Sequence, residues 1–216
     1  MNGNVEFRVM EEADVEDILL LLARSFCAYD PIEVVLGITE PEFIEMTRLD
    51  IPQILEDGLS MVAWHTGTNE RIGVTLALDA TTPFTDSTGK ITPKFAPVAA
   101  IVNQLHHPYQ EKLSQVRGYA AYYYMGAVQG SWQGRGVAQQ MFKATENLIV
   151  SKGYECLFGI VTSRGSQAAL EKNGFHCVAS NTYRGFIYQG KKPFSSIRKH
   201  PGLSLMEKHL GQAEGI

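Results

Sequence analysis

The chain has 216 residues, of which 44% are hydrophobic and 19% are charged, enough apolar material for one buried core. A formal net charge of -4 argues against nucleic-acid binding, because a clustered positive field supplies most of that affinity. The N-terminus has no basic region followed by an apolar run, and no stretch reaches the roughly 18 apolar residues of a membrane span. We therefore expect one domain over residues 1–216, located in the cytoplasm, with no nucleic-acid or membrane partner.

The first half of the chain predicts a strand, two helices and a β-hairpin. Val15, Ile18 and Leu22 follow the apolar spacing of a helix, and Asp30-Pro31 ends it, because proline disfavours helical geometry in the residue before it. The predicted elements are a strand over 5–10, helices over 11–27 and 40–56, and hairpin strands over 59–65 and 71–78. Residues 79–94 are rich in Thr, Pro, Asp and Gly and predict a surface loop.

The second half alternates helices and strands. The predicted elements are a helix over 95–116 interrupted near His107-Pro108, a strand over 118–128, a helix over 134–152, a strand over 154–161, a helix over 163–172 and strands over 175–188 and 203–209. The order predicts a mixed α/β sheet that is antiparallel early and contains a βαβ unit late.

The segment V-Q-G-S-W-Q-G-R-G-V-A, residues 128–138, follows a predicted strand and opens a predicted helix. Gly134 and Gly136 at this junction allow a ligand to approach the backbone, and a helix start offers unpaired N–H groups to a phosphate. Arg135 adds a charge-assisted contact. A plain tight turn is the alternative interpretation. The segment is neither a P-loop nor a dinucleotide fingerprint, since Gln139 replaces the third glycine of the latter.

The hexapeptide over 133–138 resembles the acetyl-CoA signature R/Q-x-x-G-x-G/A of the GCN5-related N-acetyltransferase (GNAT) superfamily, and E-K-N-G-F over 171–175 resembles a later motif of the same superfamily. The resemblance implies a mostly antiparallel central sheet that is splayed between its fourth and fifth strands, with flanking helices. It also implies acetyl-CoA as co-substrate and no metal. The implied cofactor-binding residues are Ala127, Val128, Gln133, Gly134, Arg135, Gly136, Val137, Ala138 and Ser163. Among them, an N–H near Val128 would polarise the thioester carbonyl.

A finer resemblance links the chain to the insect arylalkylamine (dopamine-type) N-acetyltransferases. Phe26 with Tyr29-Asp30-Pro31-Ile32 is similar to their F-x-x-D-E-P-L motif, and the residues about His200-Pro201-Gly202 are similar to their C-terminal run. This resemblance puts Asp30 in the position of the catalytic glutamate, as the general base. The alternative for Asp30 is a helix terminator before proline.

Ser163 and Ser166 match two serines that the arylalkylamine enzymes place near the cofactor and the leaving thiolate, which makes both candidate catalytic residues. We favour capping of the following helix, or cofactor contact, over proton transfer by these hydroxyls. Leu170 stands where many GNAT enzymes carry a tyrosine that protonates the thiolate.

The remaining candidates have simpler explanations. Tyr122, Tyr123 and Tyr124 are expected to alternate across a strand, one face toward the acceptor site. His106-His107 is better explained as a solvated loop than as a metal site. Cys156 and Cys177 are expected in the core, and Cys27 is expected near the acceptor site without a covalent role.

These inferences predict an N-acetyltransferase that acts on a small primary amine, an arylalkylamine or a polyamine, by direct attack in a ternary complex, as a monomer or homodimer. Two alternatives remain open at this point. One is acetylation of protein N-termini or lysines, and the other is a non-catalytic acyl-CoA-binding module.

Overall fold

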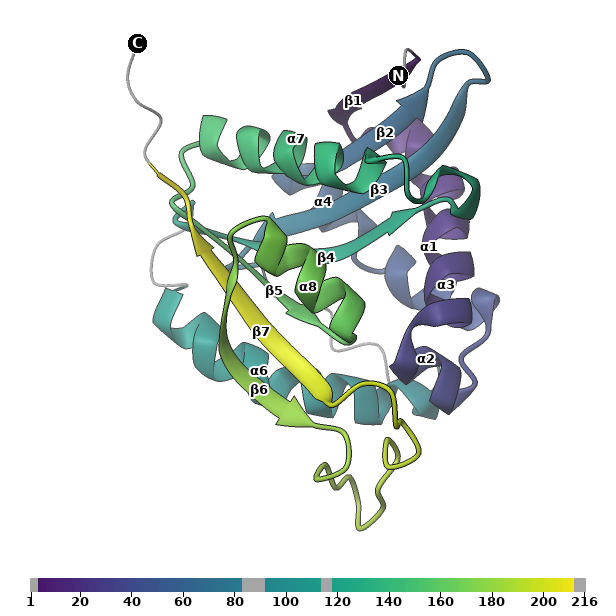
Figure 1. Ribbon diagram of the computed structural model, residues 1–216, viewed down its shortest axis with the longest axis vertical. Helices are drawn as coiled ribbons and strands as arrows, with labels where there is room; N and C mark the ends of the chain where they lie inside the picture. Colours follow the sequence, from purple (N-terminus) through teal and green to yellow (C-terminus); the bar gives the residue numbers. More distant parts are fainter. Residues whose placement is uncertain (1–3, 83–91, 114–117, 212–216) are drawn as a thin grey trace.

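A seven-stranded sheet organises the computed structural model, which describes residues 4–82, 92–113 and 118–211 (Figure 1). The strands lie in the order β1-β2-β3-β4-β5-β7-β6. Their bounds are β1 Val5–Val9, β2 Met61–His65, β3 Glu70–Asp79, β4 Ala120–Val128, β5 Cys156–Val161, β6 His176–Thr182 and β7 Gly202–His209. Only β4 and β5 run parallel, and every other neighbouring pair is antiparallel. The predicted mixed sheet with a late βαβ unit is confirmed.

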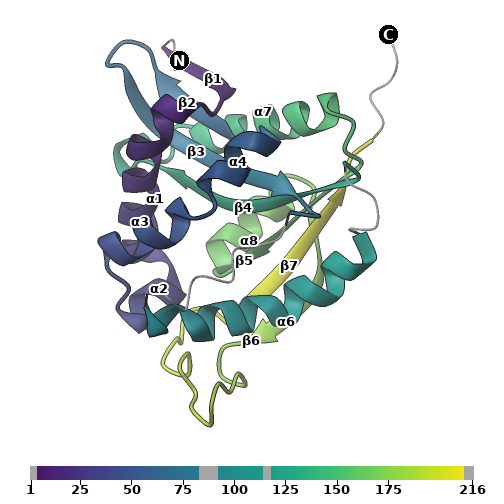
Figure 2. The same ribbon diagram turned by 180° about the vertical axis from the view of Figure 1, so that it is seen from behind.

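Helices cover both faces of this sheet. Figure 1 shows α7 and α8 on the near face, and Figure 2 shows α1, α3, α4 and α6 on the other. The helix bounds are α1 Val15–Tyr29, α2 Pro31–Leu36, α3 Glu40–Arg48, α4 Ile51–Asp57, α6 Ala96–Leu113, α7 Val137–Ser151 and α8 Arg164–Lys172. The apolar face of α1 supplies Ile18, Leu19 and Leu22 to the largest core cluster, each at most 1% exposed. Burial of a side chain of this size contributes about 2 kcal/mol.

The chain turns sharply between α1 and α2, and the sequence explains why. Asp30 has extended backbone geometry (φ -73°, ψ 129°), as expected for a residue before proline, and its N–H closes the last turn of α1 on the Phe26 carbonyl. Pro31 then starts α2, because a first helical residue needs no N–H donor. The predicted break at Asp30-Pro31 is confirmed, although α2 itself was not predicted.

Two predicted helices differ from the structure. The helix expected over 40–56 is divided into α3 and α4, since Pro52 fits only the first turn of a helix and Asp50 precedes that turn as its N-cap residue. The interruption expected at His107-Pro108 is wrong. Pro108 lies inside a continuous α6, where Leu105 and Tyr109 on its two sides pack against the body of the protein.

Two predicted boundaries also change. Asp79 is the buried last residue of β3 and not part of a surface loop, because its carboxylate accepts hydrogen bonds from the Gly118 amide (2.8 Å) and the Tyr154 hydroxyl (2.9 Å). Most of the predicted loop, 83–91, lies outside the described residues, as do residues 114–116 of the predicted helix. The strand expected over 175–188 ends at Thr182, where Tyr183 turns inward and donates to the Thr162 carbonyl (2.6 Å).

The sheet is split between β4 and β5. Their parallel pairing begins at Ala120 and Cys156 and stops at Tyr123 and Gly159, so the second half of β4 has no strand on its β5 side. A β-bulge interrupts the β3–β4 register between Leu76 and Ala77, where Tyr124 is the extra residue of β4. Such a bulge bends a strand and increases its local twist. The bulge therefore explains how β4 leaves β5, and the predicted splay is confirmed.

Candidate functional site

The turn that joins β4 to α7 exposes a cluster of backbone amides. Gly134 and Gly136 have left-handed backbone geometry, with φ of 73° and 79°, a conformation that costs other residues about 1–2 kcal/mol. Gly136 is the N-cap residue of α7 and provides no side chain to cap it. Among the described residues, no acceptor lies within hydrogen-bonding distance of the amides of Gly134, Gly136, Val137 and Ala138.

The space in front of these amides is open. A Cβ atom added at Gly134 would meet nothing within 4 Å, and one added at Gly136 would meet only the Gln140 side chain at 3.7 Å. The described neighbours do not plug the turn, and Val137 is buried beneath it. Open N–H groups at a helix start attract an anion, and a diphosphate fits this chemistry. The turn, with its glycines, is the surface that we call the amide cradle, residues 134–138.

The open edge of β4 leads away from the cradle. The Gln129 amide donates to the Ile72 carbonyl of β3 (2.8 Å), so the N–H and C=O of Val128 point to the opposite side, where β5 has separated. The Gln133 side chain donates to the Val128 carbonyl on that side (3.4 Å). Val128 thus presents its N–H on an open strand edge beside the cradle, as pairing with an added extended ligand requires.

Arg135 lies over the ring of Trp132, with 5.0 Å from the guanidinium carbon to the ring centroid. His65 from β2 packs on the same indole, with centroids 4.9 Å apart. This arrangement of cation and rings holds Arg135 beside the cradle, where it adds positive charge to the dipole of α7.

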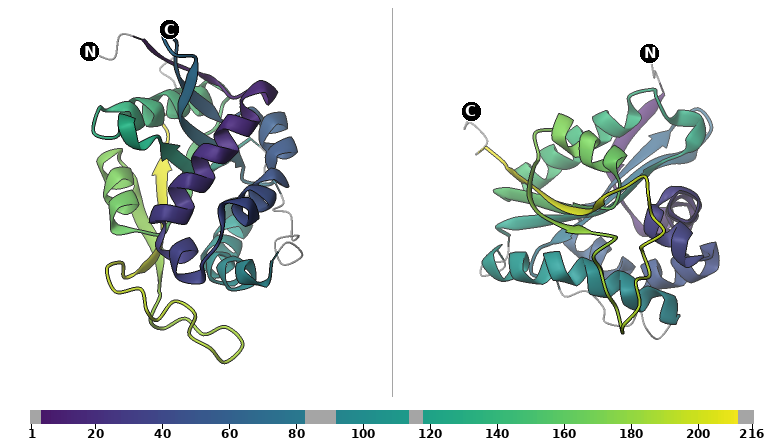
Figure 3. Two further views of the ribbon diagram at one scale, coloured as in Figure 1. Left: turned by 90° about the vertical axis from the view of Figure 1, so that its right-hand side faces the viewer. Right: turned by 60° about the horizontal axis from the view of Figure 1, so that its bottom comes forward.

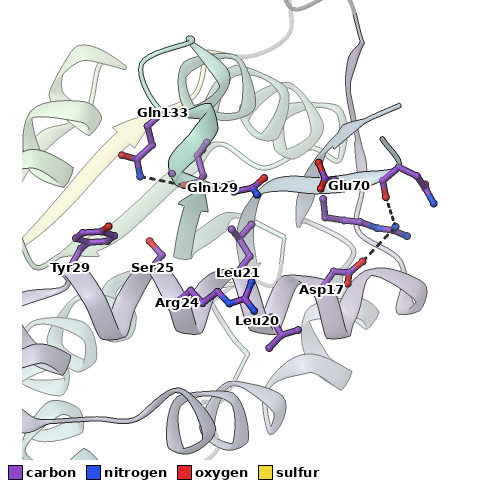
Figure 4. Close-up of a pocket in the computed structure, with 13 residues that line it drawn as sticks. Asp17, Leu20, Leu21, Arg24, Ser25, Tyr29, Glu70, Gln129 and Gln133 are labelled. Carbon is purple, nitrogen blue, oxygen red and sulfur yellow. Dashed lines mark hydrogen bonds and ion pairs between the residues drawn. The ribbon is translucent and has the colours of Figure 1, made fainter. Parts of the chain in front are cut away.

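A cleft of about 480 Å³ lies between α1 and the end of β4 (Figure 4). Leu20, Leu21, Ser25 and Tyr29 line it from α1, while Val128, Gln129, Gly130 and Gln133 line it from the β4 side. Tyr29 is 76% exposed at this cleft and directly precedes Asp30. The cleft therefore runs from the β4 edge beside the cradle to the last turn of α1, and Asp30 itself is not among its lining residues.

Asp30 bridges the two sides of the split. Its Oδ1 atom accepts a hydrogen bond from the Ile32 amide (2.9 Å), and its Oδ2 atom accepts a short one from the Thr162 hydroxyl. Thr162 directly follows β5, whereas Asp30 lies between α1 and α2. Asp30 is half-buried, so part of this residue is accessible at the split. The structure thus brings the predicted base to the mouth of the split, and also gives it the local capping contact of the alternative interpretation.

Glu33 is a functional candidate that the sequence analysis missed. It lies on α2, 7% exposed, and its Oε2 atom has no hydrogen-bond partner among the described residues. Burial raises the pKa of Glu33 well above its usual range, and the charge of Asp30 and a side-chain hydrogen bond with Asp30 raise it further. The spacing Asp30-x-x-Glu33, which is that of a capping box, is the sequence signal that could have drawn attention to it.

Ser163 and Ser166 form a capping box at the start of α8. Ser163 Oγ accepts from the Ser166 amide (3.1 Å), and Ser166 Oγ accepts from the Ser163 amide (3.2 Å). The two hydroxyl oxygens are 2.9 Å apart. The capping contacts that we favoured are present, and a catalytic role for either hydroxyl stays a prediction.

The other candidates are placed in the interior or on an edge. Tyr122 and Tyr124 pack with the core on the α1 side and Tyr123 with the core on the α7 side, which confirms the expected alternation. Burial raises the pKa of each of these phenols, with the Asp50 carboxylate adding to the effect at Tyr124, so all three remain neutral. Leu170, in the place of the usual acid, is buried in the α8 core.

Two expectations for histidine and cysteine are wrong. His106 is 2% exposed inside α6, against Tyr122 and Phe158, and burial lowers its pKa to about 4. Cys177 is exposed on β6, because β6 is the edge strand of the sheet. Cys156 is buried as expected.

Cys27 is half-buried, and burial raises its pKa to about 11, so it stays a thiol at neutral pH. Among the described residues, no three His, Cys, Asp or Glu side chains lie close enough together to hold a metal ion. Within the same ranges, none of the helices combines the length and apolar character of a membrane span.

Solved structures with this fold cover nearly the whole chain. The C-terminal condensation domain of Ebony in complex with beta-alanyl-dopamine has a TM-score of 0.86 at 17% identity, over 95% of this chain and 98% of that one. Arylalkylamine N-acetyltransferase 2 from Aedes aegypti has a TM-score of 0.79 at 18% identity, over 96% and 100%. The Drosophila melanogaster polyamine N-acetyltransferase has a TM-score of 0.74 at 15% identity, over 95% and 100%.

A scan against known protein families found no match. At these identities the similarity to solved structures shows the fold alone, and the fold is the one shared by N-acetyltransferase structures. The fold class implied by the resemblance to the GNAT superfamily is thereby confirmed. What the chain binds has to be argued from its own site.

Proposed function

We propose that the chain is an N-acyltransferase that moves the acyl group of an acyl-CoA thioester, acetyl-CoA in the simplest case, to the primary amine of a small molecule. The observation that carries this proposal is the amide cradle, residues 134–138, which opens beside the unpaired edge of β4. A coenzyme A diphosphate suits the cradle, and its extended pantetheine arm suits the strand edge at Val128. Ala127, the other residue that the resemblance implied for this arm, pairs with Val74 of β3 and directs its backbone groups into the sheet.

The chemistry then follows from the groups at the split. Asp30 accepts one proton from the substrate ammonium, and the free amine nitrogen attacks the thioester carbon. The Val128 N–H donates to the carbonyl oxygen as negative charge develops there, a type of contact worth about 3 kcal/mol. The C–S bond breaks, its electron pair leaves with the sulfur as a thiolate, and the second proton of the nitrogen passes to the thiolate or to solvent. A thiol ionises near pH 8.5, so no dedicated acid is required at Leu170.

We propose an arylalkylamine or a polyamine as the acceptor. The structures named for arylalkylamine and polyamine N-acetyltransferases support this class. The cleft supports it too, because Leu20, Leu21 and Tyr29 suit the apolar body of an arylalkylamine. Asp30, which directly follows Tyr29 in the chain, suits the ammonium group. We also propose that the chain acts in the cytoplasm and that it has no nucleic-acid or membrane partner.

A second candidate shares the acceptor but differs in the donor. The TM-score of 0.86 to a condensation domain that holds beta-alanyl-dopamine favours transfer of an aminoacyl group to an arylalkylamine. The cradle argues for the first candidate, since a donor without a diphosphate leaves those amides without a partner.

The proposal is tested by acetyl-CoA binding, measured by calorimetry, and by thiol release with a panel of tryptamine, dopamine, agmatine, spermidine and a lysine-containing peptide. We expect binding, and turnover with at least one of the small amines. Turnover with the peptide alone would establish a protein acetyltransferase instead. Binding without turnover on any acceptor would indicate a non-catalytic module. Turnover of a β-alanyl thioester of pantetheine, with no acetyl-CoA binding, would favour the second candidate.

A further inference from the structure

Glu33 lacks the hydrogen bond from the N-cap amide that a glutamate at its position in α2 normally accepts. Asp30 is the N-cap residue of α2 and Glu33 is the third helical residue, the spacing at which a glutamate accepts from the N-cap amide. The Asp30 amide instead donates to the Phe26 carbonyl at 2.9 Å, because it closes the last turn of α1. The Asp30 amide is therefore used by the last turn of α1, and it is not available to the Glu33 carboxyl.

The described residues around Glu33 offer it no positive charge. The groups that face it are the thiol of Cys27 on α1, the phenol of Tyr124 on β4 and the phenol of Tyr183 after β6, all neutral at physiological pH, together with the carboxylate of Asp30. Among the described residues, no lysine or arginine contributes to the electrostatics at Glu33. A carboxylate that is buried beside another carboxylate, with no cation, is strongly disfavoured.

The two carboxyl groups differ in access. Asp30 is half-buried and accepts from the Ile32 amide and the Thr162 hydroxyl. Glu33 is buried and its Oε2 atom has no hydrogen-bond partner in the described part of the chain, which leaves Oε1 for the hydrogen bond with Asp30. Asp30, the more accessible member of the pair, thus accepts two hydrogen bonds from the protein, while the buried Glu33 is the carboxyl that is disfavoured as an anion. Pairs of carboxyls whose surroundings separate them in this way are found where acid–base chemistry takes place.

We propose that Glu33 holds its proton at neutral pH and donates it in a hydrogen bond to Asp30, so that the two carboxyl groups carry one negative charge between them. Glu33 is then a positioning residue, which orients the Asp30 carboxylate toward the acceptor amine without touching the substrate. The role of Asp30 in this inference rests on the proposed function, while the shared proton does not.

The pair also selects the acceptor by charge. One negative charge at the mouth of the split is matched by one ammonium group, and Asp30 accepts the single proton that the amine must lose before it attacks. After acyl transfer that proton leaves Asp30 for solvent, and Glu33 still holds its own. The proton count of the pair is thereby restored at the end of each cycle.

The first test needs no turnover. In full-length protein with 13C-labelled carboxyl groups, NMR titration of the Glu33 side chain, assigned by the loss of its signal in Glu33→Gln, should give the chemical shift of a protonated acid at pH 7. A carboxylate shift for Glu33 at pH 7 would overturn the shared proton whether or not the chain is an enzyme.

The second test uses the pH profile of kcat/KM in Glu33→Gln and Glu33→Leu. The glutamine amide can still donate to Asp30, so we expect kcat/KM to fall by less than about tenfold and the acidic limb of its pH profile to stay at the same pH. Leucine cannot donate, so we expect a loss of more than about tenfold, with the acidic limb moved to higher pH by about one unit. Both variants should bind acetyl-CoA like the wild type, which shows that they are folded.

The outcomes separate the two proposals. If the wild type turns over an amine but Glu33→Leu does not move the acidic limb of the kcat/KM profile, the positioning role of Glu33 is wrong and the proposed acyltransferase function is retained. If the wild type turns over no amine and Glu33 is still protonated at pH 7, the acyltransferase is wrong and the carboxyl pair stands.

Discussion

One side of the split is formed by backbone groups and the other by side chains. The cradle side, residues 134–138, is made of backbone: amides freed by a helix start and given room by two glycines with positive φ. The acceptor side is made of side chains, Asp30 and Glu33 at the start of α2 and Thr162 after β5. Figure 3 shows how α1 and α2 lie across the mouth of the split from the β4–α7 turn.

This difference teaches where each half is vulnerable. A backbone site tolerates most substitutions and fails where a side chain blocks it or a glycine geometry is lost. A side-chain site depends on the identity and protonation of each group, and it therefore responds to pH. The following predictions test the two sides separately, each with its own control.

The largest effect is expected for Asp30→Asn. The amide cannot accept a proton from the ammonium, so turnover at pH 7 should fall by about a hundredfold or more, as for loss of a general base. The fall should be smaller at pH 9, where more of the amine is already neutral. Steady-state rates over pH 6–9 check this, and a loss of the same size at every pH would remove Asp30 from the base role. Acetyl-CoA affinity, which belongs to the cradle, should not change.

The next effect is expected for Gly136→Glu. Its carboxylate would fill the space in front of the amides and repel a diphosphate, so acetyl-CoA affinity should fall by at least about a hundredfold, roughly 3 kcal/mol. Gly153→Glu is the matched control, because Gly153 also has positive φ (87°) with nothing within 4 Å, at the opposite end of α7. Calorimetry on both variants separates blocking from backbone strain. Unchanged affinity in Gly136→Glu would refute the cradle.

A smaller effect, on stability, is expected for Glu33→Gln. The folded wild type keeps a proton on Glu33 that the unfolded chain releases above its ordinary pKa of 4.5. Folding therefore takes up a proton, and the wild type should lose stability relative to the variant as pH rises from about 4.5 toward the raised value, by up to about 1.4 kcal/mol per pH unit. Urea unfolding at several pH values measures this.

Glu42→Gln is the control for that experiment. Hydrogen bonds from Lys94 and Thr39 lower the pKa of Glu42 to about 2, so its contribution to stability is present above the ordinary value and is lost as pH falls below it. The difference between wild type and Glu42→Gln should therefore stay constant above pH 5. A constant difference for Glu33→Gln over the same range would show that Glu33 ionises in the folded protein.

The smallest effect is expected for Ser163→Ala. Loss of the N-cap hydroxyl of α8 should cost about 1 kcal/mol of unfolding free energy, because the Ser166 amide loses its acceptor. If the hydroxyl serves only to cap the helix, turnover at a temperature well below unfolding should stay within about threefold of wild type. A loss of a hundredfold in turnover with normal acetyl-CoA affinity would instead support the catalytic assignment.

The sequence by itself determined the parts of this protein that depend on neighbours along the chain. Gly134 and Gly136 at a strand-to-helix junction predicted the amide cradle, Asp30-Pro31 predicted the end of α1, and Ser163 with Ser166 predicted a helix cap. Each of these follows from backbone preferences and hydrogen bonds that span only a few residues.

Only the tertiary structure decided which groups are taken out of water together. Thr162 reaches Asp30 across 132 positions of sequence, and Glu33 is buried because α1, β4 and the chain after β6 close around it. The burial of His106 and the exposure of Cys177 were decided in the same way. Burial sets the protonation of a side chain, and burial is a property of the packed segments and not of the residue or its neighbours in sequence.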